Sequence, residues 1–245
     1  MDDRVLDWDG CYNVRDLGGL PAAGGARTRH RAVVRADSPS ALNGAGWDAL
    51  WEYGIRTVVD LTEEHERLPD TAPRPPGLTT VHVPLDGTDD AFWAPFRDNG
   101  HWGTALYYSA FLARYPDRTA AAVAAVANAA PGGVLVHCGR GRDRTGLISL
   151  LLLSLVGVEP AVVSDDYRHS DSAMVVTRRQ RLGLDDDTVR VAEIYAEAGT
   201  TPHDTIGAVL ARLDAEEHLR AGGLTDDELV AVRARLLGPV SPRSS

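Results

Sequence analysis

The feature that most constrains this chain is a ten-residue segment between two apolar runs. Residues 137–146 read HCGRGRDRTG, after the run Gly133–Val136 and before the run Leu147–Val156. This order predicts a buried strand, a tight glycine-rich loop and a buried helix. Such a loop directs backbone N–H groups and the positive end of the helix dipole at one position. The sequence therefore predicts an anion-binding site in this loop.

Strand and helix patterns alternate through the first 157 residues. Short β-branched or apolar runs predict strands, and apolar residues at three- and four-residue spacing predict helices. This alternation favours an α/β fold, with a mainly parallel sheet covered by helices on both faces. We expect strands at Val33–Val34, Ile55–Leu61, Leu78–Val83 and Val134–His137, and helices at Ala45–Tyr53, Gly103–Tyr115 and Thr119–Ala130.

After Gly157 the pattern is helical only, which predicts C-terminal helices added to the sheet. Prolines at first-turn positions and a capping box at Thr225 and Glu228 mark several helix starts. We expect one domain over residues 1–238 and a disordered tail over 239–245. The helices are expected at Pro160–His169, Ser172–Leu182, Asp187–Ala198, Pro202–His218 and Thr225–Leu237.

Charge and cysteine content limit the possible functions. The formal net charge of -10 argues against a nucleic-acid partner or an anionic membrane surface. The two cysteines, Cys11 and Cys138, lie far apart and favour a reducing compartment. Without a recognisable signal peptide or a long enough apolar stretch, we expect a cytoplasmic protein that is not inserted in a membrane. Cys11 is interpreted as a packing residue, with a protective disulfide to Cys138 as the alternative.

Cys138 and Arg144 give the loop its expected chemistry. A thiolate is a nucleophile, and a guanidinium binds phosphate through two hydrogen bonds. Together they predict cleavage of a phosphate ester through phosphocysteine, with no metal or cofactor required. A core cysteine in an ordinary turn would not require this spacing. The glycines at 139, 141 and 146 are expected to serve the anion cradle, and the expected phosphate-binding residues are Gly139, Arg140, Gly141, Arg142, Asp143 and Arg144.

The group that protonates the leaving oxygen is less clearly marked. Asp143, inside the loop, is the first candidate, with bracing of the loop as its alternative role. Asp86 is the second, because it belongs to an acidic segment after a predicted strand, where a mobile loop could reach the site. Thr145 is expected to donate its hydroxyl to the Cys138 sulfur. His137 is expected to fix the loop through backbone hydrogen bonds.

The loop resembles the His-Cys-x5-Arg-Thr-Gly signature of the cysteine-dependent protein tyrosine phosphatase superfamily. Asn13–Gly19 and Asp165–Ser170 resemble two further motifs of its bacterial tyrosine/lipid phosphatase branch, and Gly54–Leu61 resembles a strand of that branch. The resemblance covers most of the chain and implies a protein-tyrosine-phosphatase-like fold. In some members, C-terminal helices cover the site as a lid. Within the first motif, Arg15 and Asp16 are expected to form a structural pair or to shape the pocket.

Two positions depart from the branch pattern. Arg142 stands where the branch has lysine, which argues against phosphoinositide activity. Thr62 stands where the branch commonly has arginine, which removes another anion contact. The leading hypothesis is a phosphomonoesterase acting on phosphotyrosine, with a small phosphorylated metabolite as the alternative substrate. A rhodanese-like sulfur transferase and a non-catalytic phosphate-binding module are weaker hypotheses. The oligomeric state stays open, as does the role of the aromatic residues Phe92, Trp93, Trp102, Tyr107, Tyr108 and Tyr167, which either line a substrate cleft or belong to the core.

Overall fold

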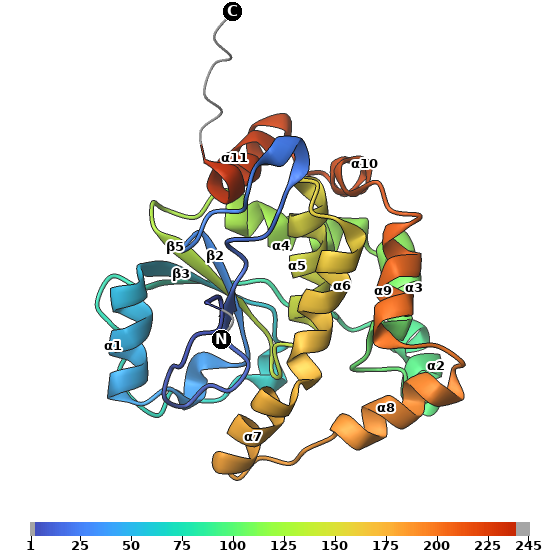
Figure 1. The fold of residues 1–245 in the computed structure, drawn as a ribbon, viewed down its shortest axis with the longest axis horizontal. Helices are drawn as coiled ribbons and strands as arrows, with labels where there is room; N and C mark the ends of the chain where they lie inside the picture. The colour runs from blue at the N-terminus through green and yellow to red at the C-terminus, as the bar shows by residue number, and fades with distance from the viewer. Residues whose placement is uncertain (1–2, 239–245) are drawn as a thin grey trace, which may run out of the picture.

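The central element is a mainly parallel sheet, shown in a computed structural model that describes residues 3–238 (Figure 1). The predicted tail at 239–245 lies outside the described residues. Within them, five strands form one sheet in the order β1-β2-β5-β3-β4, in which only β1 runs antiparallel to its neighbour. This confirms the predicted α/β class. The strands are β1 (Arg15–Asp16), β2 (Val33–Ala36), β3 (Ile55–Asp60), β4 (Thr79–His82) and β5 (Gly133–His137).

The two faces of the sheet pack against different parts of the chain. Alternate residues of β5 point to opposite faces, so that Leu135 joins one apolar cluster while Val134 and Val136 join the other. The first cluster lies under α1 (Gly44–Tyr53) and includes its Trp47. The second, larger cluster contains residues from α3 (Tyr108–Arg114), α4 (Pro116–Ala127), α5 (Asp143–Leu155), α6 (Pro160–Arg168), α9 (Pro202–Leu210), α10 (Ala215–Ala221) and α11 (Asp226–Leu237).

Two helical assignments differ from the expectation. The prediction of one helix over Pro202–His218 is wrong, because α9 ends at Leu210 and a second helix, α10, begins at Ala215. Asp214 caps α10 by accepting a hydrogen bond from Glu217 N at 2.9 Å. The acidic segment near residue 90 forms α2 (Asp90–Asp98) instead of a loop. The remaining helices are α7 (Ala173–Arg181) and α8 (Thr188–Glu197). No helix in residues 3–238 is both long and apolar enough to cross a membrane.

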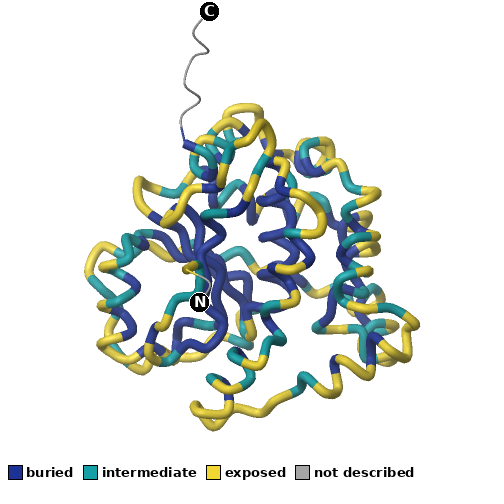
Figure 2. The backbone as a smooth tube through the Cα atoms, in the orientation of Figure 1, coloured by how far each residue is buried: buried dark blue, intermediate teal, exposed yellow. Residues whose placement is uncertain are grey.

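The strand register brings three chain segments together at one edge. His137, the last residue of β5, pairs with Ala36 of β2 and Asp60 of β3, the last residues of their own strands. Because these strands are parallel, the loops that follow them leave the same edge of the sheet. The strands β2, β3 and β5 lie in the buried interior (Figure 2), so these loops are attached to a rigid frame. Cys138 is the first residue beyond β5.

Candidate active site

The loop between β5 and α5 is hydrogen-bonded on its outer side. Side chains and one amide from distant segments donate to its carbonyl oxygens: Ser38 N to Gly139 O (3.2 Å), Asn13 Nδ2 to Arg140 O (2.9 Å), and Arg35 Nη2 to Gly141 O (2.8 Å) and Arg142 O (3.3 Å). Tyr108 also donates its hydroxyl to the carbonyl of Asp143. These bonds fix the orientation of the peptide planes from behind.

The amides of the same loop are free. No described residue accepts a hydrogen bond from the backbone N–H groups of residues 139–145. The last of these belong to the first turn of α5, where helix geometry leaves N–H groups without a partner in the helix. Free amides next to a helix N-terminus attract an anion through hydrogen bonds and the helix dipole. The loop therefore has the properties of an oxyanion cradle.

The glycines at the three positions 139, 141 and 146 have different structural surroundings. Gly141 has φ 66°, and a Cβ there would lie 2.5 Å from the carbonyl of Ala36, so it permits the loop to lie against the end of β2. At Gly139 a Cβ would have no neighbour closer than Arg144 Nη2 at 4.0 Å. At Gly146 it would lie 2.8 Å from the Tyr167 ring. The expectation that all three serve the anion is therefore corrected for Gly146, which instead lets α5 pack closely against a tyrosine.

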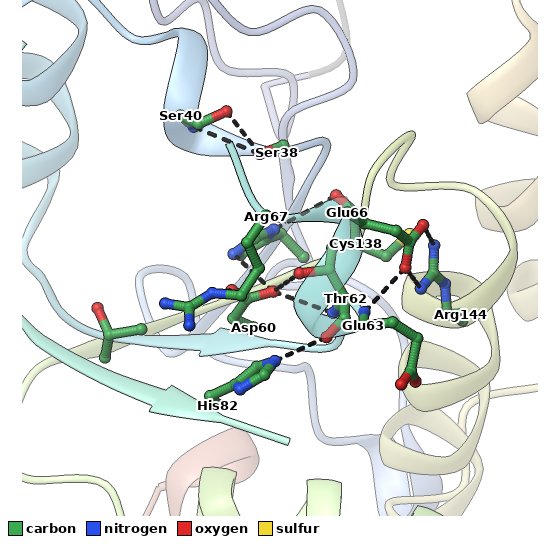
Figure 3. A network of polar contacts seen from close by, with 12 residues as sticks. Ser38, Ser40, Asp60, Thr62, Glu63, Glu66, Arg67, His82, Cys138 and Arg144 are labelled. Atoms are coloured by element: carbon green, nitrogen blue, oxygen red, sulfur yellow. Dashed lines mark hydrogen bonds and ion pairs between the residues drawn. The ribbon is translucent and has the colours of Figure 1, made fainter. Parts of the chain in front are cut away.

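Cys138 begins this loop, and the Arg144 side chain, from the first turn of α5, points toward Glu66 (Figure 3). Cys138 is fully buried, and its Sγ lies 4.0 Å from Asp143 Oδ1. Arg144 pairs with Glu66 through both terminal nitrogens, with Nη2 at 2.7 Å from Oε1. Its Nε is buried and has no hydrogen-bond partner among the described residues. One edge of the guanidinium is thus held by a carboxylate, and the Nε edge remains available to an anion.

Glu66 is a site residue that the motif reasoning missed. It lies in the short 3-10 helix Glu64–Glu66 after β3, where its Oε2 also accepts a hydrogen bond from Glu63 N at 2.8 Å. Glu63 in turn accepts hydrogen bonds from the amides of Asp86 and Gly87, both at 3.0 Å. The available signal was the Glu-x-x-Glu capping spacing in the acidic segment after Asp60. This segment connects Arg144 with Asp86.

Asp86 lies beside Arg144. Its Oδ2 lies 3.5 Å from Arg144 Nη1, and the side chain is almost fully buried. Burial raises the pKa of Asp86 from the ordinary aspartate value of 3.8 to about 7; Arg144 opposes this rise, and Asp143 adds to it. Trp93 Nε1 donates to the Asp86 carbonyl at 3.0 Å. The carboxyl can therefore carry a proton near neutral pH.

His137 precedes Cys138 in the chain, and Thr145 follows Arg144. Burial lowers the pKa of His137 to about 4, against the opposing charge of Asp60, so the imidazole is neutral at pH 7. His137 Nδ1 lies 3.3 Å from Cys138 O and its Nε2 lies 3.6 Å from Asp60 Oδ1, which fits the expected role of fixing the loop. The Thr145 hydroxyl is buried and has no hydrogen-bond partner among the described residues. The expected hydrogen bond to Cys138 is not formed.

Arg15 and Asp16 support the site through separate partners, and the expected pair between them is absent. Arg15 lies 3.1 Å from Asp166 Oδ1 and donates to Asn13 Oδ1 at 2.6 Å. Asp166 also pairs with Arg35 at 2.7 Å. Burial would raise the pKa of Asp166, but Arg15 and Arg35 hold it well below the ordinary range. Asp166 of α6 therefore connects the N-terminal motif with Arg35, the arginine that donates to the carbonyls of Gly141 and Arg142.

Asp16 fixes the turn that follows β1. It accepts hydrogen bonds from Gly18 N at 2.8 Å, Arg31 N at 2.6 Å and the Tyr53 hydroxyl at 2.6 Å. All these partners lie in the β1–β2 connection or in α1. The role of Asp16 is therefore structural.

Arg142 and Arg140 contact the C-terminal helices with their side chains. Arg142 lies 3.0 Å from Asp171 Oδ1 and 2.9 Å from Asp187 Oδ2. Asp187 also pairs with Arg140 at 2.5 Å and with Arg179 at 2.8 Å. In this state, the side chains of Arg140 and Arg142 connect the loop to the segment between α7 and α8. Movement of that segment as a lid stays a prediction.

Cys11 is buried on the other face of the sheet, in the cluster under α1. Both cysteines are free, and Cys11 Sγ lies 3.6 Å from Ser38 O. Burial raises the pKa of Cys11, and the neighbouring charge of Asp37 adds to the rise. Within residues 3–238, no group of three or more His, Cys, Asp or Glu side chains is arranged to hold a metal ion.

Comparisons with known proteins agree with this geometry. Residues 6–238 match the model of the tyrosine phosphatase family. A Cupriavidus necator protein assigned to the tyrosine-protein phosphatases is 33% identical over 175 residues, which cover 68% of this chain and 63% of that protein. A tyrosine-protein phosphatase from Nostoc commune is 27% identical, with 84% of this chain and 74% of that protein covered. The triple specificity protein phosphatase PtpB from Mycobacterium tuberculosis is 27% identical, with 96% and 99% covered. The chain belongs to the tyrosine phosphatase family.

Proposed function

We propose that this protein hydrolyses phosphate monoesters through a phosphocysteine on Cys138. The observation that carries the proposal is the combination of free amides at residues 139–145, a buried thiol on the residue that begins this loop, and the unpartnered Nε of Arg144. A phosphoryl group seated there would receive hydrogen bonds from the amides and from the guanidinium. These donors are fixed before the substrate binds, so they stabilise the charge of the transition state at little reorganisation cost.

The reaction has two steps that balance. The Cys138 thiolate attacks phosphorus, the bond to the ester oxygen breaks, and the leaving oxygen takes a proton from a carboxylic acid. A water molecule then attacks the phosphocysteine and gives its proton to the same carboxylate. The bond between sulfur and phosphorus breaks, which restores the thiolate and releases inorganic phosphate. His137, neutral and held at the loop backbone, takes no proton in this scheme.

Asp86 is the proton donor that we propose, with Asp143 as the second candidate. In-line attack puts the leaving oxygen on the side of phosphorus opposite the sulfur. Asp143 lies next to the sulfur itself, with Oδ1 at 4.0 Å from Sγ. Asp86 lies instead at Arg144, and burial raises its pKa to about 7. A group with this pKa can donate a proton in the first step and accept one in the second.

The substrate class that we propose is phosphotyrosine. This rests on the resemblance of the loop and on the names of the Nostoc and Cupriavidus relatives. The name of the mycobacterial relative states three specificities for that protein. No feature of the site favours the alternative of a small phosphorylated metabolite. The cytoplasmic location likewise stays a prediction from the sequence.

Turnover of p-nitrophenyl phosphate in the presence of EDTA tests the reaction type. We expect activity in the unaltered protein and none after Cys138→Ser. Asp86→Asn is expected to lower turnover far more than Asp143→Asn. Phosphotyrosine, phosphoserine and sugar phosphate substrates then test the substrate class. Activity that survives Cys138→Ser would refute the phosphocysteine mechanism, and a larger loss for Asp143→Asn would transfer the acid role to Asp143.

A further inference from the structure

A hollow of about 330 Å³ lies directly beside the proposed catalytic groups. Two of its lining residues, Glu66 and Asp86, are the carboxylates that contact Arg144. The hollow and the phosphate cradle therefore share a wall. Its volume is at the lower end of the range for small-molecule sites, which suits one ring and its nearest substituents. In the proposed reaction only Asp86 and Glu66 of this lining have a role.

The position of Asp86 connects the hollow to the substrate. If Asp86 protonates the leaving oxygen, this oxygen must come within hydrogen-bond distance of a carboxyl that itself lines the hollow. The organic group attached to the leaving oxygen then extends away from the cradle and into the hollow. This step rests on the proposed function, because it requires a phosphate on Arg144 and an acid at Asp86.

Two tryptophans give the hollow its apolar surface. Trp93 is buried, and its indole N–H is already bound to the Asp86 carbonyl, which fixes the ring beside the acid. Trp102 is 49% exposed, although most large apolar side chains of this chain are buried. Its backbone N–H donates to Phe96 O at 2.9 Å, which holds the turn after α2 at the edge of the hollow. An indole in this position offers a face for another ring.

The other aromatic residues of the region belong to the core. Tyr107, Tyr108 and Tyr167 are all at most 2% exposed, and the Tyr107 ring lies 5.1 Å from Trp93. Phe92 packs between Phe111 and Tyr115, with ring centroids at 6.0 and 5.0 Å. Tyr107 and Phe92 pack directly against Trp93, with ring centroids at 5.1 and 4.9 Å. Of the six aromatic residues considered from the sequence, Trp93 and Trp102 line the hollow.

We infer that this hollow is the leaving-group subsite and that Trp102 makes the enzyme select aryl over alkyl phosphate monoesters. An aromatic leaving group buries its ring against Trp102 and gains a ring-to-ring contact in addition to the apolar area that it buries. A short alkyl group reaches Asp86 equally well but covers little of the indole. Trp102 is thus a specificity-determining residue that takes no part in bond making.

The test compares phosphotyrosine with phosphoserine for the unaltered protein and for Trp102→Ala, Trp102→Phe and Val230→Ala. Each variant is compared with the unaltered protein on the same substrate, so the different reactivities of the two leaving groups cancel. Val230 is an exposed apolar residue of α11 and serves as the matched control. Melting temperatures confirm that each variant is folded.

We expect Trp102→Ala to lower kcat/KM for phosphotyrosine about tenfold, from the ring contact and its buried area. The value for phosphoserine should stay unchanged, Trp102→Phe should retain most of the phosphotyrosine activity, and Val230→Ala should change neither. An equal loss on both substrates, or no loss on either, would overturn the subsite and leave the phosphatase reaction standing. If the unaltered protein hydrolyses neither substrate, the proposed function and the subsite both fall.

Discussion

Replacing Asp86 by asparagine should increase stability at high pH while lowering activity. Burial raises the pKa of this carboxyl from 3.8 to about 7, against the opposing charge of Arg144. Below pH 3.8 the group is protonated in the folded and the unfolded chain. Between pH 3.8 and about 7 the unfolded chain releases a proton that the folded chain retains, so stability falls as the pH rises. Above about pH 7 this loss is complete.

The size of the loss follows from the two pKa values. The difference between 3.8 and about 7, at about 1.4 kcal/mol per pH unit, corresponds to about 4 kcal/mol. Asparagine has no charge to release and avoids this loss. The unfolding free energy of Asp86→Asn minus that of the unaltered protein should therefore increase by about 4 kcal/mol between pH 4 and pH 8. The altered contact with Arg144 adds an offset that does not depend on pH in this range.

Urea unfolding at a series of pH values measures this difference, and kcat/KM measured over the same range tests the chemical role. For the unaltered protein kcat/KM should fall as the pH rises past about 7, because the acid must be protonated in the first step. Asp86→Asn should lower kcat/KM by a factor of about 10² to 10⁴ and remove this dependence. A stability difference that stays constant from pH 4 to pH 8 would refute the raised pKa. An unchanged kcat/KM would refute the role as acid.

Two further predictions concern the arginine and the helix behind the loop. Glu66→Gln should lower kcat/KM about tenfold to a hundredfold, because a charged hydrogen bond that orients Arg144 is weakened, whereas the exposed neighbour Glu64→Gln should have no effect in the same assay. Equal effects of both would contradict the orienting role. Gly146→Ala should destabilise the fold by about 1–3 kcal/mol in urea unfolding, because its Cβ would lie 2.8 Å from the Tyr167 ring. At Gly207 in helix α9 an added Cβ meets no atom within 4 Å, so Gly207→Ala should stabilise the fold by about 0.5–1 kcal/mol. If Gly207→Ala destabilised the fold more than Gly146→Ala, close packing of α5 against Tyr167 would not be the reason for glycine at 146.

The sequence predicted those parts of the site that are encoded in adjacent residues. The strand, loop and helix around Cys138 follow from a local pattern of apolar runs and glycines, and the structure has them at the predicted positions. The error at Pro202–His218 has a local cause, because one helical periodicity continues across a break that Asp214 caps. Helix α2 was missed because its acidic residues and Pro95 are typical of a loop.

The partners of the loop could not be derived from spacing alone. Glu66 reaches Arg144 across 78 residues of chain, and Arg35 reaches the Gly141 carbonyl across 106. Such contacts depend on the strand order, which puts β2 and β3 on either side of β5. The N-terminal motif indicated that Arg15 supports the fold or the pocket, but its ion pair with Asp166 is visible only in the structure. Arg142 shows the same limit, since its position in the loop did not predict its ion pair with Asp187.

In the proposed mechanism, Cys138 carries the phosphoryl group during turnover. The most direct measurement is mass spectrometry of protein quenched within one turnover of p-nitrophenyl phosphate, followed by mapping of the modified peptide. We expect the mass of one phosphoryl group on the peptide that contains Cys138, and we expect it to be absent after Cys138→Ser. A phosphoryl group on another residue would contradict this mechanism. Turnover of p-nitrophenyl phosphate to p-nitrophenol and phosphate by the Cys138→Ser protein would also contradict it.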